Sequence, residues 1–228
     1  METRGVSVQR SEKVITIDGP SGAGKTTIAR LIARELGFTY LDTGALYRAT
    51  ALALRNRAID PDDSDERLRS VLDNVTITFE SGKVLIDGVD VSGQIRSREM
   101  DHYSSVYSAR KGVRDFLLSA QRDAAIRDNL IVEGRDTGTI VFPEAERKIF
   151  LDASVRERAK RRYEQYREQG IDISMDEARK GIIERDSRDA NRDIAPLKAA
   201  TSALIVDSSH LDVAQVVKKI LGFVKGAG

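Results

Sequence analysis

Cysteine is absent from the 228 residues of the chain, which excludes disulfide bonds and thiolate metal sites. Histidine occurs only at His102 and His210, so a histidine-rich metal centre is not expected. No apolar run approaches the ~20 residues that cross a membrane, and residues 1–13 lack the apolar segment of a signal peptide. We therefore expect a soluble, monomeric, cytoplasmic protein with a flexible leader at residues 1–13.

An excess of either charge is also missing. Lys and Arg number 37 and Asp and Glu 36, a net charge of +1 that gives no general attraction to nucleic acid or anionic lipid. Aromatic residues make up 5%, too few to suggest a platform for stacking bases. We expect neither nucleic acid nor membrane as a partner. Arginine outnumbers lysine 26 to 11, which suits a protein that binds anions but equally fits a bias in genomic composition.

Five short apolar runs predict buried strands, and each ends in an acidic residue. Patterns typical of helices separate most of them, which favours one α/β domain built on a parallel sheet. Ligands bind such sheets at the carboxyl edge, where Asp18, Asp42, Glu133 and Asp152 are expected to gather. The five runs are 14–18, 38–42, 130–133, 148–152 and 203–207.

The segment 74–91 interrupts this alternation. Its short alternating runs are separated by Ser81-Gly82 and Asp87-Gly88, which predicts an antiparallel meander of two or three strands outside the main sheet. Two helices follow, with a break near Lys111-Gly112 and the second extending to Arg127. Two more charged helices are predicted, from Ser154 to about Gln169 and from Ser174 to about Arg192. The stretch 156–192 contains nine arginines and nine acidic residues. Most of those charges fit exposed ion pairs.

The segment Gly19 to Thr26 matches the phosphate-binding pattern G-x-x-x-x-G-K-[ST]. An apolar strand precedes it and a helix follows from Thr26 to Leu36, which disfavours a plain glycine turn. Lys25 can reach the outer phosphates of a nucleoside triphosphate, and the Thr26 hydroxyl can ligate Mg²⁺. The residues expected to bind ATP are Gly19, Pro20, Ser21, Gly22, Ala23, Gly24, Lys25, Thr26 and Thr27.

Two further segments follow predicted strands. After the second strand, Thr43, Tyr47 and Arg48 could offer two hydroxyls and a guanidinium to one phosphate, although a capped helix with an exposed arginine explains them as well. After the third, Arg135 could bind a phosphate and Asp136 could accept a hydrogen bond from the amine of cytosine. A purely structural role for this charged pair is equally open.

The segment 184–192 contains a third group of charges. On a helix, Arg185, Arg188, Asp189 and Arg192 lie at i, i+3, i+4 and i+7, so three guanidiniums share one face with a single carboxylate. A nucleotide phosphate would balance this charge. A surface array of ion pairs is the alternative, and it is the better explanation for Arg188.

Taken together and in this order, these segments resemble those of the bacterial cytidylate kinases. The resemblance runs through nearly the whole chain from Val14. The phosphate-binding loop is generic, whereas T-G-A-L-Y-R and G-R-D-T-G are specific to that family. The matching residues are 18–27, 41–48, Val91-Ser92, Ile95-Arg96, Val113-Arg114, 133–138, Phe142-Pro143, 150–153, 184–192 and Ala195-Pro196-Leu197.

The resemblance implies the nucleoside monophosphate kinase fold, with a five-stranded parallel sheet flanked by helices, a small antiparallel insertion and a helical lid. It divides residues 14–228 into a core, a nucleotide-binding region and a lid. The core comprises 14–42, 128–155 and 193–228; the nucleotide-binding region is 43–127 with its insertion at about 74–101; the lid is about 156–192.

The resemblance also assigns roles. Lys25, Arg135, Arg185 and Arg192 are implied as catalytic residues. Thr43, Arg48 and Arg135 are implied to bind the phosphate of CMP; Ser105, Arg114 and Asp136 the cytosine; Tyr47, Arg185 and Asp189 the ribose and its phosphate; Arg192 the transferring group; and Arg158, Arg161 and Arg162 the ATP. Three conservative departures occur: Lys-Thr-Thr ends the phosphate-binding loop, Glu133 replaces a frequent Asp, and Thr43 replaces an occasional Ser.

The implied activity is phosphoryl transfer from MgATP to CMP or dCMP, without a covalent intermediate. A uridylate, adenylate or shikimate kinase is an alternative that the meander and Asp136 argue against. A GTPase-type switch would need an N-K-x-D segment to recognise guanine, and the sequence has none. A nucleic-acid-binding ATPase has little support, because the chain lacks a basic excess.

Overall fold

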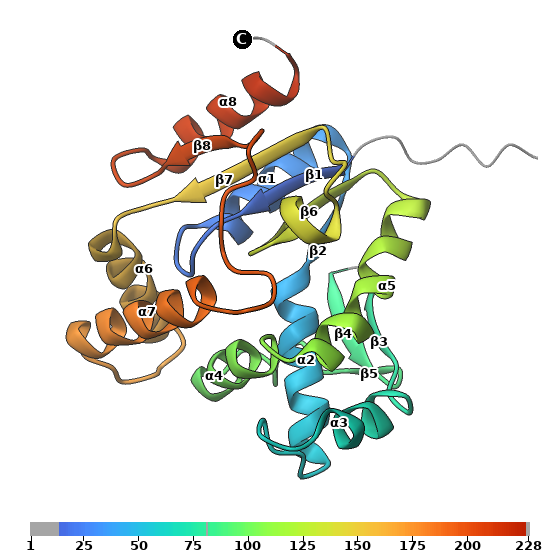
Figure 1. Ribbon diagram of the computed structural model, residues 1–228. Helices are drawn as coiled ribbons and strands as arrows, with labels where there is room; N and C mark the ends of the chain where they lie inside the picture. Colours follow the sequence, from blue (N-terminus) through green and yellow to red (C-terminus); the bar gives the residue numbers. More distant parts are fainter. Residues whose placement is uncertain (1–13, 81, 227–228) are drawn as a thin grey trace, which may run out of the picture.

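The computed structural model of the protein describes residues 14–80 and 82–226. The main sheet has five parallel strands in the order β2-β6-β1-β7-β8, with β1 in the centre (Figure 1). All five strands predicted from apolar runs are confirmed. They are β1 (Val14–Asp18), β2 (Thr39–Asp42), β6 (Leu130–Gly134), β7 (Arg147–Asp152) and β8 (Leu204–Asp207).

Helices cover both faces of this sheet, and successive residues of one strand serve different faces. On β6, Ile131 packs with helices α1 and α8, whereas Leu130 and Val132 pack with α2 and the small antiparallel sheet. A strand buried on both faces reads as a continuous apolar run, which is why the sequence revealed it. The helices are α1 (Lys25–Leu36), α2 (Thr43–Asn56), α3 (Asp65–Leu72), α4 (Arg98–Tyr107), α5 (Lys111–Arg127), α6 (Val155–Glu168), α7 (Met175–Ala190) and α8 (Val213–Val224).

The predicted meander is confirmed as a separate sheet of three antiparallel strands, β3 (Ile77–Glu80), β4 (Lys83–Ile86) and β5 (Val89–Asp90). Asp87 and Gly88 connect β4 to β5 with φ angles of 50° and 79°, the left-handed conformation that a two-residue hairpin turn requires. The other predicted turn includes Ser81, which lies outside the described residues. The meander packs against α2 and shares a hydrophobic core with Leu41 of β2 and with Leu130 and Val132 of β6.

Helices α6 and α7 form a hairpin that stands beside the carboxyl edge of the main sheet (Figure 1). Ser154 caps α6 by accepting from the N–H of Glu157, and Gly170 leaves the helix with a φ of 72°. Ser174 and Glu177 form a reciprocal capping box at the start of α7. Both predicted starts are confirmed. The end of α7, predicted at about Arg192, lies two residues earlier, at Ala190, and Asn191 follows as its cap.

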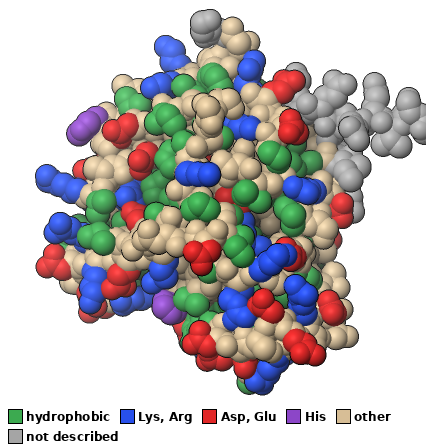
Figure 2. Space-filling model, in the orientation of Figure 1, with side chains coloured by type: hydrophobic (Ala, Val, Ile, Leu, Met, Phe, Trp, Pro, Cys, Tyr) green, Lys and Arg blue, Asp and Glu red, His purple; other side chains and the backbone are tan. Residues whose placement is uncertain are grey.

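The surface carries both charges in close mixture. On the face seen in Figure 2, Lys and Arg side chains are interspersed with Asp and Glu, in keeping with a net charge of +1. Within residues 14–80 and 82–226, no helix combines the length and apolar character needed to cross a membrane. The predicted leader, residues 1–13, lies outside the described part.

Candidate active site

The loop between β1 and α1 has the backbone that a phosphate-binding loop requires. Gly19 has a φ of 149°, and a Cβ there would lie 1.9 Å from the carbonyl oxygen of Leu151, so only glycine fits. Gly24 precedes α1 in the left-handed conformation and gives no side-chain cap to its first N–H groups. Those N–H groups and the helix dipole therefore remain available to an anion. Lys25 Nζ donates to the carbonyl of Pro20 at 2.7 Å.

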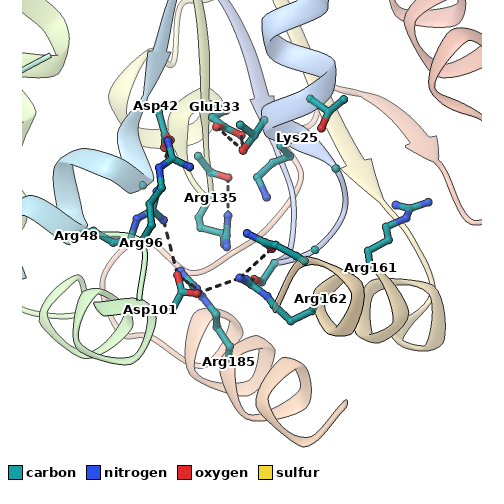
Figure 3. A pocket seen from close by; sticks show the side chains of 18 of the residues that line it. Lys25, Asp42, Arg48, Arg96, Asp101, Glu133, Arg135, Arg161, Arg162 and Arg185 are labelled. Carbon is teal, nitrogen blue, oxygen red and sulfur yellow. Dashed lines mark hydrogen bonds and ion pairs between the residues drawn. The ribbon is translucent and has the colours of Figure 1, made fainter. Parts of the chain in front are cut away.

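A cavity of about 480 Å³ opens beside this loop and is strongly basic. Seven of its side chains are cationic and three are acidic. It lies between the carboxyl edge of the sheet and the α6–α7 hairpin (Figure 3). Its charged lining residues are Lys25, Arg48, Arg96, Arg135, Arg161, Arg162 and Arg185 with Asp42, Asp101 and Glu133.

The basic groups of the cavity repel one another. Burial and the charge of Arg135 lower the pKa of Lys25 well below its ordinary value. The same two causes lower the pKa of Arg185 to about 10. A group in such surroundings gains from any anion that enters, so the cavity is suited to a polyphosphate.

Glu133, at the end of β6, bonds directly to Thr26, which follows the phosphate-binding glycines. Thr26 Oγ1 donates to its Oε1 at 2.8 Å, and the Tyr40 hydroxyl also donates to it. Burial, reinforced by Asp42, raises the pKa of the Glu133 carboxyl. In the described part of the chain, no three His, Cys, Asp or Glu side chains come together to hold a metal by themselves. The hydroxyl and carboxylate oxygens at this spot are nevertheless hard ligands, of the kind Mg²⁺ shares with phosphates.

The three residues expected to bind a second phosphate are only partly brought together. Arg48 and Arg135 both line the cavity. Thr43 is buried, and its hydroxyl donates to the backbone carbonyl of Glu133 at 2.6 Å. Arg48 lies 3.5 Å from Asp42, the residue that caps α2. Thr43 thus holds the end of β6 in place, and the two arginines face the cavity.

The residues that are expected to recognise the base gather behind Arg135, outside the lining of the cavity. Asp136 and Arg114 form a buried ion pair, and Arg114 also donates to the carbonyl of Ser108 at 3.3 Å. The guanidinium carbon of Arg114 lies 5.7 Å from the centre of the Tyr47 ring. Burial raises the pKa of Asp136, and Arg114 opposes that rise. Ser105 lies on α4 and accepts a hydrogen bond from Arg188 Nε at 3.2 Å.

The arginines near the end of α7 surround Asp189. Arg135 Nε donates to Asp189 Oδ2 at 2.9 Å, Arg185 Nε lies 3.9 Å away, and Arg192 Nη2 lies 3.5 Å from Oδ1. Arg192 was expected on the same helical face, but it follows the end of α7 and reaches Asp189 from the next loop. Burial raises the pKa of Asp189, and the three arginines lower it by more, leaving it below its usual value.

Two residues expected at the rim, Asp18 and Asp152, and one expected to contact ATP, Arg158, do not line the cavity. Asp18 is buried and accepts from the N–H groups of Thr137 and Gly138 at 2.9 and 2.7 Å, so it fastens the loop after β6. Asp152 accepts from the N–H of Ala153 instead. Arg158 is buried against Asp186 at 2.7 Å.

The structure also adds residues that sequence reasoning missed. Asp101 and Arg96 line the cavity, and Tyr40 supports Glu133. Arg188 is half-buried and bonded to Ser105, so its assignment to a surface ion-pair array is wrong. Tyr40 lies two residues before Asp42, near the carboxyl end of a predicted strand, which was a usable signal; nothing in the local sequence distinguished Asp101.

Comparisons with known proteins agree with this geometry. The family model described as cytidylate kinase matches residues 15–226. A cytidylate kinase of Pasteurella multocida is 46% identical over 93% of this chain and 95% of its own length. One of Colwellia psychrerythraea is 44% identical over 96% and 99%. A solved shikimate kinase from Bacteroides thetaiotaomicron, 14% identical, aligns with a TM-score of 0.50 over 93% of this chain and 98% of its own, which shows the shared fold alone.

Proposed function

Because the chain belongs to the cytidylate kinase family, we propose that its cavity transfers the terminal phosphoryl group of ATP directly to the phosphate of CMP or dCMP. One observation carries the proposal: two adjacent residues have different surroundings, one lining the basic cavity and the other held in a buried ion pair. Arg135 lines the basic cavity that also contains Lys25, and Asp136 pairs with Arg114 behind it. A phosphate held by Arg135 would therefore leave its base within reach of Asp136.

ATP is assigned to residues 19–27. The unpaired N–H groups at the start of α1 and the Lys25 ammonium would bind the β- and γ-phosphates. Arg161 and Arg162 of α6 line the same cavity and would contact the nucleotide from the opposite side. Arg158 is left out of this set, since its guanidinium is engaged with Asp186.

The Thr26 hydroxyl and the Glu133 carboxylate would hold Mg²⁺ together with the phosphates of ATP. When bound, Mg²⁺ neutralises phosphate charge and orients the oxygen atoms of the donor. Tyr40 donates to Glu133 and keeps that carboxylate beside the phosphate-binding loop.

The phosphate of CMP is assigned to Arg48 and Arg135, with Thr43 fixing the backbone beneath them. Its oxygen is already an anion, so the reaction needs no dedicated general base. Arg185 and Arg192 would offset the charge that spreads over the transferring group. Catalysis then rests on alignment and charge neutralisation, without a covalent intermediate.

Cytosine is assigned to Asp136, Arg114 and Ser105, and the ribose to Tyr47 and Asp189. A carboxylate can accept a hydrogen bond from the 4-amino group of cytosine, whereas it repels the carbonyl that uracil has there. The cluster of Asp136 with Arg114 supports this assignment, because the arginine holds the carboxylate in one orientation.

We also propose the division of labour within the chain. Residues 14–42, 128–155 and 193–228 form the core, 43–127 with the insertion at about 74–101 bind the monophosphate, and about 156–192 form a lid that closes over ATP. A closing lid excludes water, which would otherwise accept the phosphoryl group. The hairpin of α6 and α7, joined by a loop around Gly170, supports this role.

The enzyme is proposed to act as a cytoplasmic monomer on free nucleotides, with neither nucleic acid nor membrane as a partner. Sedimentation velocity at micromolar concentration should give a single species of about the 25.2 kDa calculated for the chain. A species of twice that mass would contradict the monomer.

A coupled assay of ADP release tests the function. CMP and dCMP should be phosphorylated faster than UMP, AMP and GMP at equal concentration. The matched control is Lys25→Ala, which should lose turnover yet still bind CMP in calorimetry, because Lys25 is assigned to ATP alone. AMP or UMP as the best acceptor would overturn the proposal.

A further inference from the structure

Asp101, in the middle of α4, connects three other helices through one carboxylate. Its Oδ2 accepts from Arg162 Nη1 at 3.0 Å and from the Tyr166 hydroxyl at 3.2 Å, both on α6. Its Oδ1 lies 3.5 Å from Arg185 Nη1 on α7 and 3.9 Å from Arg48 Nη1 on α2. Figure 3 shows the carboxylate in the cavity, facing these guanidiniums.

One carboxylate serves these arginines incompletely. The buried Nε atoms of Arg48 and Arg185 have no hydrogen-bond partner among the residues that the structure describes. The contact of Arg48 with Asp101, at 3.9 Å, is an ion pair that is too long for a hydrogen bond. A phosphoryl group offers more acceptor oxygens and more negative charge than a carboxylate, so it can satisfy the same guanidiniums better.

The charge of Asp101 is nevertheless essential to the arrangement. Burial raises the pKa of its carboxyl, and Arg162, Arg185 and Arg48 lower it by more, so it stays ionised at neutral pH. It is one of three acidic groups against seven cations in the cavity. Without that charge, Arg162 would lose the carboxylate that pairs with it, and Arg48 and Arg185 would keep only Asp42 at 3.5 Å and Asp189 at 3.9 Å.

Within residues 14–80 and 82–226, no backbone hydrogen bond connects the parts of the molecule that these contacts join. Asp101 belongs to the region assigned to CMP, whereas Arg162, Tyr166 and Arg185 belong to the hairpin assigned as the lid. Arg162 in turn donates to Ser21 Oγ of the phosphate-binding loop at 2.7 Å. Asp101 therefore occupies the position from which a phosphate would contact all three elements.

We propose that Asp101 is a positioning residue that takes the place of a substrate phosphate: it holds Arg48, Arg162 and Arg185 around one point, and an incoming phosphoryl group displaces it. This inference rests on the proposed function, since it takes those arginines as phosphate ligands. Asp101 lowers the affinity for phosphates by competing with them, and in return it keeps the guanidiniums aligned and the lid near the site.

Pyrophosphate is the probe, titrated in a buffer free of phosphate and sulfate with thermal unfolding as the readout. Asp101→Asn should melt below the wild type without pyrophosphate, because the three arginines then repel one another. Its half-saturating pyrophosphate concentration should be about tenfold lower than that of the wild type, since no carboxylate competes. The KM of Asp101→Asn for ATP should also be lower than that of the wild type.

Glu99→Gln is the matched control. It removes the same charge from the same helix, but Glu99 pairs with Arg55 at 2.8 Å and is not among the residues that line the basic cavity. Its pyrophosphate titration should coincide with that of the wild type. If Asp101→Asn is unfolded in the anion-free buffer, saturating pyrophosphate should restore its folding.

Equal half-saturation for the wild type and Asp101→Asn would overturn the inference, as would an Asp101→Asn chain that saturating pyrophosphate cannot refold. Activity separates this failure from that of the proposed function. If the wild type converts CMP to CDP but the titrations of the two proteins coincide, only the proposed role of Asp101 is excluded. If the wild type is inactive with CMP, the proposed function and this inference are both excluded.

Discussion

Asp136 has two partners to satisfy: it is paired with Arg114, and it is assigned to recognise the base. Asp136→Asn keeps the shape but replaces an acceptor oxygen by an amide that donates. The ratio of kcat/KM for CMP to that for UMP should fall about tenfold or more, because one misplaced hydrogen bond costs about 1–3 kcal/mol. Steady-state kinetics with both nucleotides measures the ratio.

Asp123→Asn provides the control for Asp136→Asn, because Asp123 is an exposed carboxylate on α5 outside the cavity. Its nucleotide preference should match that of the wild type. An unaltered ratio in Asp136→Asn would remove that residue from base recognition.

Because of Asp189, the free energy of unfolding should decrease at acid pH. Its pKa lies below the usual 3.8, through Arg135, Arg185 and Arg192 acting against burial. The unfolded chain therefore binds a proton at a higher pH than the folded one. The stabilisation is complete above the unfolded pKa and is lost as pH falls through the folded pKa. Urea unfolding between pH 2.5 and 6 should show this loss.

Asp189→Asn is expected to lower the free energy of unfolding at pH 7 by about 1.5–3 kcal/mol and to flatten the acid dependence. The comparison is made with Asp176→Asn, an exposed residue at the start of α7. An acid profile for Asp189→Asn as steep as that of the wild type would contradict the assignment of this dependence to Asp189.

Among the helices, α7 depends on its first turn, because its mostly polar surface buries little. Its buried residues are Ala178, Ile182 and Asp189. Ser174→Ala removes the reciprocal cap with Glu177 and should cost about 0.5–2 kcal/mol. Hydrogen exchange of the α7 amides should speed up accordingly, whereas Ser174→Asp should restore protection. Equal exchange in all three proteins would show that packing against α6 alone sustains the helix.

The elements that local chemistry determines were predictable from the sequence. The strands are buried on both faces and read as apolar runs, and glycines or capping serines mark the limits of α6 and the start of α7. The end of α7 was not predictable, because charged residues continue past Ala190 and no glycine stops the helix. The arginines still meet at Asp189, since the loop after Ala190 turns back toward it.

Asp101 could not be found in this way, because its importance arises only when α4, α6 and α7 come together. On α4 it is one polar residue among several, at a position that no motif marks. The roles of Thr43 and Asp18 were equally hidden. Thr43 bonds to the end of β6 and Asp18 to the loop after it, and only the parallel pairing of the strands brings those segments into contact.

At the scale of the whole molecule, substrate binding should stabilise folding. At 100 times its Kd, CMP adds about 2.7 kcal/mol, which for a chain of this size raises Tm by about 5–10 °C. UMP at the same concentration should raise it less. Differential scanning fluorimetry measures both, and equal shifts for CMP and UMP would contradict selective binding of cytosine.

Cationic side chains are concentrated around the cavity, although the chain as a whole is nearly neutral. A net charge of +1 coexists with seven cations around one cavity, so compensating acids lie elsewhere on the surface. The cavity is expected to attract nucleotides locally, whereas a net charge of +1 gives no general attraction to other polyanions.

The pairing of β1 with β6 has a last consequence. Asp18 and Gly134 are direct partners in the parallel register, so the loops assigned to the two nucleotides leave the sheet at the same height, on strands about 4.8 Å apart. The distance between the reacting groups is therefore set by the spacing of the strands in the sheet. Movement of the proposed α6–α7 lid would alter how often that gap is shielded from water, while its width is set by the hydrogen bonds of the sheet.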